Sequence, residues 1–455
     1  MSSPWLQKSP VLTPAIPPRP KSGMWPAATA IAVIVFCLQL FVTTKINSHG
    51  HLQMLNRFFD ADNAWYLVNF ETGDQKFGSY GGRNLVHPNV ANFVHPLVML
   101  VSGAAHLISH KSNAELVEAV SLAVAPAFAG MRSGLLFAAL ITASFSLVDA
   151  IFGTLLCSVA FSSVLFGCLP ESFVISGAWF AAYSLVSAQS ASEHKLHSAR
   201  WALVAMLLSS STITNLWPFA AGLFVLLVVV VRDAKPFKTI AIVICAGLAA
   251  TFLCFGVLTA AHGSFHGIGR RVGQLDEVKF SPQSMFINFP LTLARSLVAD
   301  RPNQLTGTDE EHKSANIQVV RFTFREDLDL IKQAVPTIAA VQRYARNWPL
   351  EFATLAIMLT AIIVSIKGLP TFLLPVKAIF LVSITQIVAH WLLHSFFGLE
   401  LFLYSQHWIV PLTIALCCGT TLPGYSRWVA RTAIVALIAM AAYQTTSVMR
   451  ILISA

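Results

Sequence analysis

The sequence predicts an all-α polytopic integral membrane protein, and three observations support this prediction. The 455-residue chain is 55% hydrophobic and only 11% charged, whereas soluble proteins average about 45–50% apolar and about 25% charged residues. Apolar stretches of about 17–25 residues recur from Met24 onward, and each is long enough to cross a hydrocarbon core of about 30 Å as a helix. These stretches lack the alternation of polar and apolar residues that marks a membrane β-barrel.

The chain is expected to form one transmembrane domain over residues 24–455 behind a short tail, residues 1–23. The tail is rich in proline and carries Lys8, Arg19 and Lys21, a composition typical of a disordered cytoplasmic segment. The apolar run over 24–44 is of full spanning length, which favours a membrane helix over a cleaved signal peptide.

The apolar runs predict about 11–13 transmembrane helices. Proline, serine and asparagine interrupt the runs between residues 94 and 231, so we expect broken or re-entrant helices there. The candidate crossings are 24–44, 94–109, 114–130, 133–150, 152–169, 171–189, 200–214, 217–231, 237–261, 348–366, 376–396, 402–422 and 428–448.

The distribution of lysine and arginine predicts the orientation of the chain. With the N-terminus in the cytoplasm, the short cytoplasmic turns hold Lys111, Lys195, Arg200, Arg232, Lys235, Lys238, Lys367, Lys377, Arg427 and Arg431. Two long outer loops, about 45–93 and 262–347, then face the periplasm of a bacterial inner membrane. The net charge of +9 is scattered over short loops, so a nucleic-acid partner is not expected.

Polar residues gather on the outer side of this topology. Ionisable side chains at membrane depth cost about 2.5–3.5 kcal/mol on insertion, and those retained usually mark a site or pathway. A histidine that precedes a proline at a helix start has the alternative role of a cap or interface residue. The candidate substrate-binding residues are His87, His95, Glu171, Asn215, Tyr404 and His407.

Four carboxylates follow the first apolar run, in "NRFFDADNAWYLVNFETGDQ" at residues 56–75. On a helix, side chains two residues apart point about 200° away from each other, so only one of Asp60 and Asp62 would then serve the site; an irregular loop would let both converge. Asp60 is favoured as general base because it follows two phenylalanines that can bury it partly and raise its pKa. Glu71 and Asp74 are interpreted as a solvated loop face.

The second outer loop supplies cationic side chains suited to clamping a lipid phosphate or pyrophosphate. The alternative for each is contact with lipid headgroups or with nearby acidic residues. Arg295 belongs to this loop, and the residues assigned to the phosphate are Arg270, Arg271, Arg321 and Arg325.

Metal and nucleotide motifs are sparse. His390 and His394 have the i, i+4 spacing of a metal-binding pair, but no acidic ligand lies near them on that helix face, so no metal residue is assigned. The sequence contains no GxxxxGKS/T, GxGxxG or HExxH motif, which disfavours a substrate activated in the cytosol as a nucleotide conjugate.

The layout of the chain resembles the membrane-embedded glycosyltransferases of the C-type fold (GT-C). The resemblance rests on the acidic stretch after the first span, the return through "HP", the many spans and the second large outer loop, and it extends to "PESF" around Glu171 and "FLYSQHW" around Tyr404 and His407. In that superfamily the first outer loop carries an essential acidic residue, matched here by Asp60 or Asp62.

The resemblance implies an inverting transfer of a sugar from a polyprenyl-phosphate carrier to a glycan or lipid acceptor at the outer membrane face. The carboxylate would deprotonate the acceptor hydroxyl while cationic or histidine side chains stabilise the departing lipid phosphate. No cofactor is assigned, although Mg²⁺ or Mn²⁺ is compatible with this chemistry.

Two other classes fit parts of the same pattern. A secondary transporter or lipid-linked-sugar flippase also builds its sites from broken helices and buried polar residues. A surface-polysaccharide polymerase or ligase would share the lipid-phosphate chemistry but needs an oligosaccharide-lipid donor.

Overall fold

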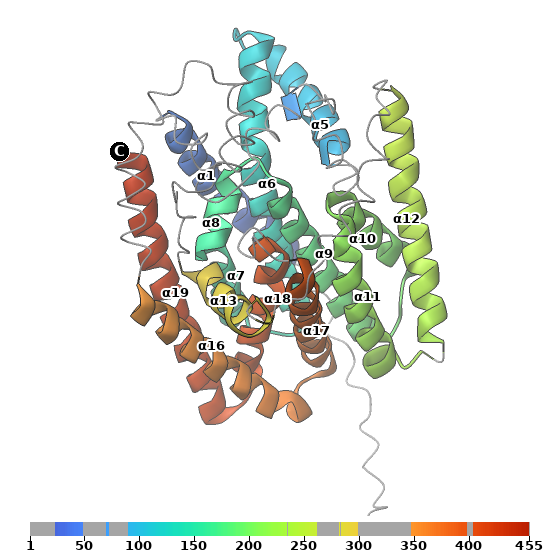
Figure 1. Cartoon of the computed structure of the whole chain (residues 1–455), viewed down its shortest axis with the longest axis vertical. Coiled ribbons are helices and arrows are strands. Elements are labelled where there is room, and N and C mark those ends of the chain that lie inside the picture. The colour runs from blue at the N-terminus through green and yellow to red at the C-terminus, as the bar shows by residue number, and fades with distance from the viewer. Residues whose placement is uncertain are drawn as a thin grey trace, which may run out of the picture.

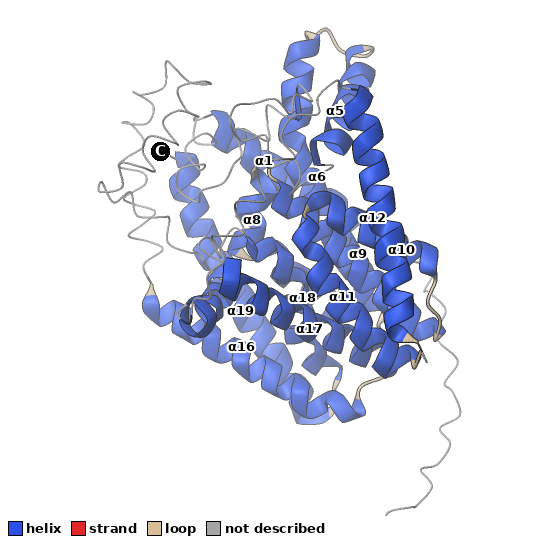
Figure 2. Cartoon of the chain, turned by 45° about the vertical axis from the view of Figure 1, so that its right-hand side comes forward, coloured by secondary structure: helices blue, strands red, loops and turns tan. Residues whose placement is uncertain are grey.

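The computed structural model describes residues 23–48, 70–71, 90–233, 235–261, 282, 284–298, 347–397 and 404–454. Every regular element in these ranges is helical (Figure 2), which confirms the all-α class. The α-helices are α1 (Met24–Ser48), α5 (Val90–His106), α6 (Asn113–Thr142), α7 (Leu147–Val159), α8 (Phe161–Cys168), α9 (Ser172–Glu193), α10 (Ser198–Ser211), α11 (Leu216–Val225), α12 (Pro236–Ala261), α13 (Phe289–Leu297), α16 (Trp348–Gly368), α17 (Leu374–Phe397), α18 (Ser405–Cys417) and α19 (Gly424–Ser454). Short 3₁₀ or π segments are η2 (Ile213–Asn215), η3 (Leu226–Val231), η6 (Ser284–Asn288), η7 (Leu369–Thr371) and η9 (Cys418–Thr421).

The chain is an integral membrane protein. Within the described ranges, seven helical segments are long and apolar enough to cross a membrane, and the bent pair α7 and α8 makes an eighth. This number is below the predicted 11–13, because α5 and several interior helices are shorter or more polar than a lipid-facing span. The seven are Met24–Ser48, Asn113–Thr142, Ile213–Val231, Pro236–Cys254, Trp348–Thr371, Leu374–Phe396 and Gly424–Ile453.

The largest correction to the predicted topology concerns α5 and α6. The crossings predicted at 114–130 and 133–150 are replaced by one 30-residue helix, α6, followed by a turn and α7. The crossing predicted at 94–109 corresponds to α5, which packs beside the first half of α6 (Figure 1). Thr142, the last residue of α6, contacts Met24 at the start of α1. Lys111, just before α6, therefore lies at the other end of this helix, whereas the sequence predicted it on the same side as Met24.

Two glycines explain why α6 continues where a turn was predicted. A Cβ atom on Gly130 would lie 2.5 Å from the backbone oxygen of Ala32, and one on Gly134 would lie 2.8 Å from that of Ala28. Small residues four apart allow such close packing of membrane helices. The "GMRSG" stretch is therefore a helix contact with α1.

The broken helices expected between residues 94 and 231 are present. The helix axis bends by 60° between α7 and α8, where Ala160 leaves helical geometry. The segment after α10 passes through a 3₁₀ turn into α11 and ends in a π-helical stretch. These breaks lie among other helices, where neighbouring protein covers the freed backbone groups.

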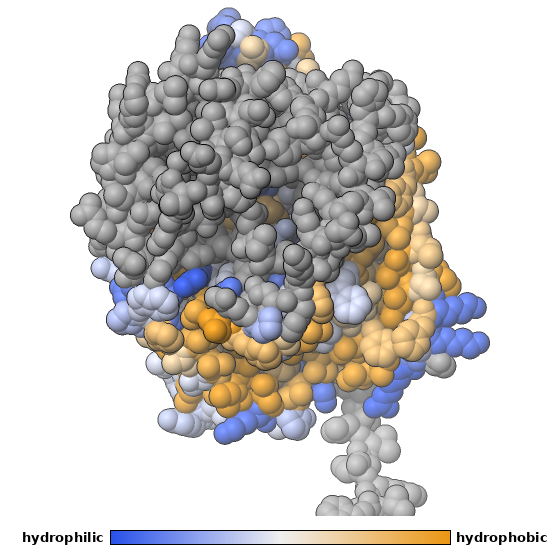
Figure 3. Space-filling view, in the orientation of Figure 1, coloured by the Kyte–Doolittle hydropathy of each residue, from blue (hydrophilic) through white to orange (hydrophobic). Residues whose placement is uncertain are grey.

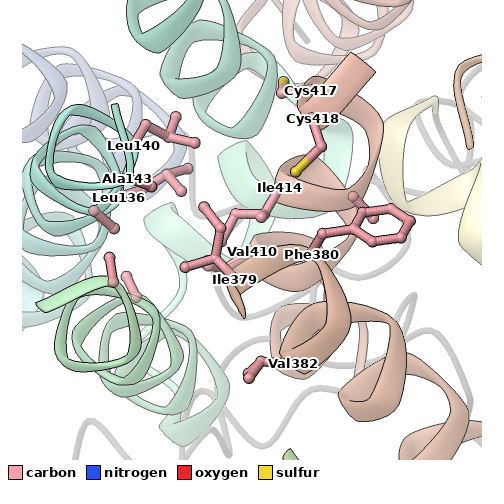
Figure 4. Close-up of a cluster of buried hydrophobic side chains, with 14 of the residues drawn as sticks. Leu136, Leu140, Ala143, Ile379, Phe380, Val382, Val410, Ile414, Cys417 and Cys418 are labelled. Carbon is pink, nitrogen blue, oxygen red and sulfur yellow. The ribbon is translucent and has the colours of Figure 1, made fainter. Parts of the chain in front are cut away.

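The core joins helices that are distant in sequence. Leu136 and Leu140 of α6 lie near Ile379 of α17 and near Val410 and Ile414 of α18 (Figure 4). The nearly fully buried helix α9 packs against α6, α10, α17 and α18. Small serine and alanine side chains on α9 permit this close packing.

The flank of the bundle formed by α12 is apolar and exposed. Phe237, Ile242, Leu253 and Val257 are all more than half exposed, and Figure 3 shows apolar side chains along this edge of the molecule. An exposed apolar helix face is expected where lipid takes the place of water.

Several helix ends lie near one another in the bundle. Thr43, near the end of α1, donates a hydrogen bond to the backbone oxygen of Cys168, just before α9. The start of α18 joins the same region, since Phe173 contacts Tyr404 and Trp408 donates a hydrogen bond to Ser296 of α13. The ends of α1 and α13 and the start of α18 therefore lie around the start of α9.

Candidate functional site

Glu171 is the N-cap of α9 and lies in the protein interior, 1% exposed. Its Oε2 accepts a hydrogen bond of 2.8 Å from the backbone N–H of Ser172, and the positive end of the helix dipole stabilises a carboxylate at this position. The ring of Phe173 lies 5.4 Å from that of Tyr404 and 5.7 Å from that of His407. Tyr404 and His407 therefore both lie against Phe173, two residues after Glu171.

Two further histidines join His407. His390 and His394 lie one turn apart on α17 with their rings stacked, 5.8 Å between centroids, and His407 of α18 lies 5.5 Å from His390. The Tyr404 ring is 4.3 Å from that of His394. The sequence showed the pair on α17 without a further ligand; the third side chain comes from another helix.

A buried arginine lies beside this group. Arg132 of α6 has no exposed surface and donates a hydrogen bond from Nη1 to Oε1 of Gln406, the residue before His407. Its Nε and Nη2 form no hydrogen bond with the described residues. Gly177, about one and a half turns into α9 from Glu171, makes room for this contact.

We call Arg132, Glu171, His390, His394, Tyr404, Gln406 and His407 the polar cluster. The imidazoles and the phenol of Tyr404 lie side by side here, and Arg132 is joined to Gln406. The buried Glu171 is two residues before Phe173, which contacts Tyr404 and His407. Such an arrangement can bind an anion, hold a cation through its imidazoles and orient a hydroxyl.

Two predicted residues lie outside the polar cluster. Asn215 donates hydrogen bonds from Nδ2 to Ser176 and to the backbone oxygen of Leu208, which ties α9 to α10. Nδ1 of His95 lies 2.9 Å from the backbone oxygen of Phe70, so this ring anchors residues 70–71 to α5.

Glu71 differs from the solvated side chain that the sequence predicted. It is half-buried beside Phe70, and this burial, with repulsion from Glu118 of α6, raises the pKa of its carboxyl group. Arg295 also differs from the prediction of a loop cation, because it lies on α13 and pairs with the buried Glu351 of α16 at 3.2 Å.

The remaining predicted residues, Asp60, Asp62, His87, Arg270, Arg271, Arg321 and Arg325, lie outside the described residues. The Mg²⁺ or Mn²⁺ considered from the sequence fits oxygen ligands and not the all-nitrogen set of the histidines.

Sequence reasoning missed Arg132 and Gln406. Arg132 interrupts an apolar run between two glycines and was placed in a turn; the signal that could have identified it is the four-residue spacing of Gly130 and Gly134, which favours a continuous packed helix. Gln406 carried no signal, because its partner is distant in sequence.

The fold and the polar cluster define an all-α integral membrane protein with a buried polar site where α6, α9, α17 and α18 pack together. No model of a known protein family matches the chain, and no curated protein matches it.

Proposed function

We propose that the protein is a membrane-embedded glycosyltransferase that takes a sugar from a polyprenyl-phosphate carrier at the outer face of a bacterial inner membrane. The observation that carries the proposal is that the buried Arg132 bonds to Gln406 beside His407. His407 and Tyr404 both lie against Phe173, two residues after the buried Glu171. An anion would stabilise the charge of a guanidinium in this low-dielectric interior, and phosphate matches the geometry of its N–H groups. A lipid-linked phosphate is an anion that can reach such a site from the bilayer.

The reaction would proceed as a single displacement. Asp60 or Asp62 takes the proton of the acceptor hydroxyl, whose oxygen attacks the anomeric carbon and inverts it. The bond from the anomeric carbon to the phosphate oxygen breaks, and its electron pair leaves with the lipid phosphate. Arg132 and His407 stabilise the charge that develops on that phosphate.

One observation favours a second candidate, a transporter or flippase for lipid-linked sugars. Arg132 lies ten residues before the end of α6, about 15 Å along the helix from Thr142, which is near the middle of a hydrocarbon core of about 30 Å. Carriers place their sites at this depth and build them from broken helices such as α7 and α8.

The deciding experiment is sugar transfer by the purified protein in nanodiscs, with a panel of polyprenyl-phosphate sugars. We expect wild type to release polyprenyl phosphate, with loss of turnover in either Asp60→Asn or Asp62→Asn and a fall of about 100-fold in Arg132→Met. Arg200→Gln is the matched control, because Arg200 is exposed at the far end of α9.

The opposite outcome is equally specific. If no donor is cleaved, and proteoliposomes instead move a labelled lipid-linked sugar between leaflets in a way that depends on Arg132, the glycosyltransferase is rejected in favour of the flippase.

A further inference from the structure

The imidazoles of His390, His394 and His407 converge in the interior of the protein. Each offers one ring nitrogen such that the three atoms lie within 4.8 Å of one another. His390 and His394 are on the same face of α17, as residues four apart must be, and His407 approaches from the first turn of α18. We propose that these histidines form a binding site for a divalent transition metal, of which Zn²⁺ is the best match.

The first argument is that the imidazoles of α17 lack other polar partners. His390 and His394 are 0% and 3% exposed, and neither ring nitrogen of either residue forms a hydrogen bond with the described residues. Buried polar atoms without partners cost free energy and require a specific explanation. A metal ion would satisfy one nitrogen of each ring at once.

The second argument is geometric. Three nitrogens bound tetrahedrally to one Zn²⁺ at about 2.0–2.1 Å are about 3.3 Å apart. The three ring nitrogens lie within 4.8 Å of one another, and small rotations of the rings can bring them to the shorter separation that Zn²⁺ requires. Because two of the ligands are on one helix, only the approach of α18 to α17 has to adjust.

The third argument concerns the surroundings. Trp408 lies edge-on to His390 and His394, with centroids 6.1 and 5.6 Å away, and Phe180 lies 5.4 Å from His390. This aromatic wall excludes water, which strengthens metal-ligand bonds and fixes the rings. Imidazole donors suit Zn²⁺, Cu²⁺, Ni²⁺ and Fe²⁺ in preference to Mg²⁺ or Mn²⁺.

The set of protein ligands leaves one position of a tetrahedral ion open. Sites with three protein ligands and an open fourth position are typical of catalytic zinc, whereas structural zinc has four protein ligands. Arg132 is close to the site through Gln406 and His407, so an anionic fourth ligand is favoured by the local charge. Metal binding itself does not depend on the proposed glycosyl transfer.

The test is metal binding by the full-length protein, purified without a histidine tag, stripped with chelator and dialysed against Zn²⁺. We expect one tightly bound Zn²⁺ per chain by elemental analysis. His390→Gln, His394→Gln and His407→Gln should each weaken the affinity by at least about 100-fold, since even the loss of a group that supports a ligand costs 10–100-fold. Bound Co²⁺ should give the visible absorption of a tetrahedral site in wild type but not in these three variants.

His197→Gln is the matched control, because His197 lies at the far end of α9 and pairs with the exposed Glu193; its Zn²⁺ content should equal that of wild type. Bound Zn²⁺ should also raise the midpoint of thermal unfolding in wild type and in this control, but not in the three cluster variants. Wild type without stoichiometric Zn²⁺, or tight binding that survives all three substitutions, overturns the proposal. Sugar transfer is a separate measurement, so the two proposals fail independently.

Discussion

Arg132 of α6 and Gln406 of α18 are 274 residues apart in the sequence and are joined by a hydrogen bond in the protein interior. A Cβ on Gly177 of α9 would lie 3.2 Å from the backbone oxygen of Gln406 and 3.3 Å from Cδ of Arg132, so three helices meet closely at this contact. Among the described residues, only one nitrogen of the guanidinium has a hydrogen-bond partner. A buried charge so weakly compensated does not stabilise a fold, which favours a ligand-binding role.

Arg132→Met separates the two roles. The change removes a buried charge while keeping most of the side-chain volume, and such replacements are often neutral or stabilising. We expect an unchanged or higher midpoint of thermal unfolding in detergent, together with weaker binding of labelled polyprenyl phosphate. A midpoint well below that of wild type would assign Arg132 to the architecture and remove it from the site.

In contrast to Arg132, Arg431 has a carboxylate as its partner, that of Asp149. Asp149 of α7 is 2% exposed and accepts two hydrogen bonds from Arg431 of α19, at 2.8 and 3.0 Å. Asp149→Asn should destabilise the protein by about 3 kcal/mol, because Arg431 loses its counter-charge in a partly buried position. Thermal unfolding should show that Arg431→Met lowers stability less when it is added to Asp149→Asn than when it is made in wild type. Strictly additive losses of stability would argue against coupling of the two residues.

The relative directions of the later helices were predictable from the sequence because two errors cancelled. Three crossings were predicted between residues 94 and 150, and the structure has one, α6, in their place. Both numbers are odd, so each later helix keeps its predicted direction. The sequence predicted Glu171, Tyr404 and His407 on one side of the membrane, and in the structure Tyr404 and His407 both contact Phe173, two residues after Glu171.

The chemistry around them was less predictable, because it depends on contacts between distant helices. The i, i+4 spacing of His390 and His394 predicted that they share a helix face, but the approach of His407 depends on how α18 packs on α17. Arg132 was missed for a different reason. Two glycines that flank a polar stretch are typical of a turn, but here Gly130 and Gly134 pack against α1 within one continuous helix.

Gly130→Ala tests that packing. The new Cβ would lie 2.5 Å from the backbone oxygen of Ala32, so α1 must move away, and overpacking of this kind costs about 1–3 kcal/mol. We expect a lower midpoint of thermal unfolding. The matched control is Gly103→Ala on α5, where nothing lies within 4 Å of the added Cβ and the higher helix propensity of alanine should leave stability unchanged or raised. Equal effects of the two substitutions would contradict the close contact of α1 with α6.

Glu71 gives a dependence of stability on pH. Burial, with the charge of Glu118, raises its pKa above the ordinary value of 4.5, so the folded state holds this proton more tightly than the unfolded state does. Between the unfolded and the folded pKa the folded protein binds more protons, and stability therefore falls as pH rises through that window. Glu71→Gln removes this loss, so its midpoint of thermal unfolding should gain on that of wild type as the pH is raised from about 4 to about 7. Glu118→Gln should give a smaller gain in the same direction, because it removes only the repulsion. A difference between Glu71→Gln and wild type that stays constant over this pH range would show that the carboxyl group of Glu71 is solvated after all.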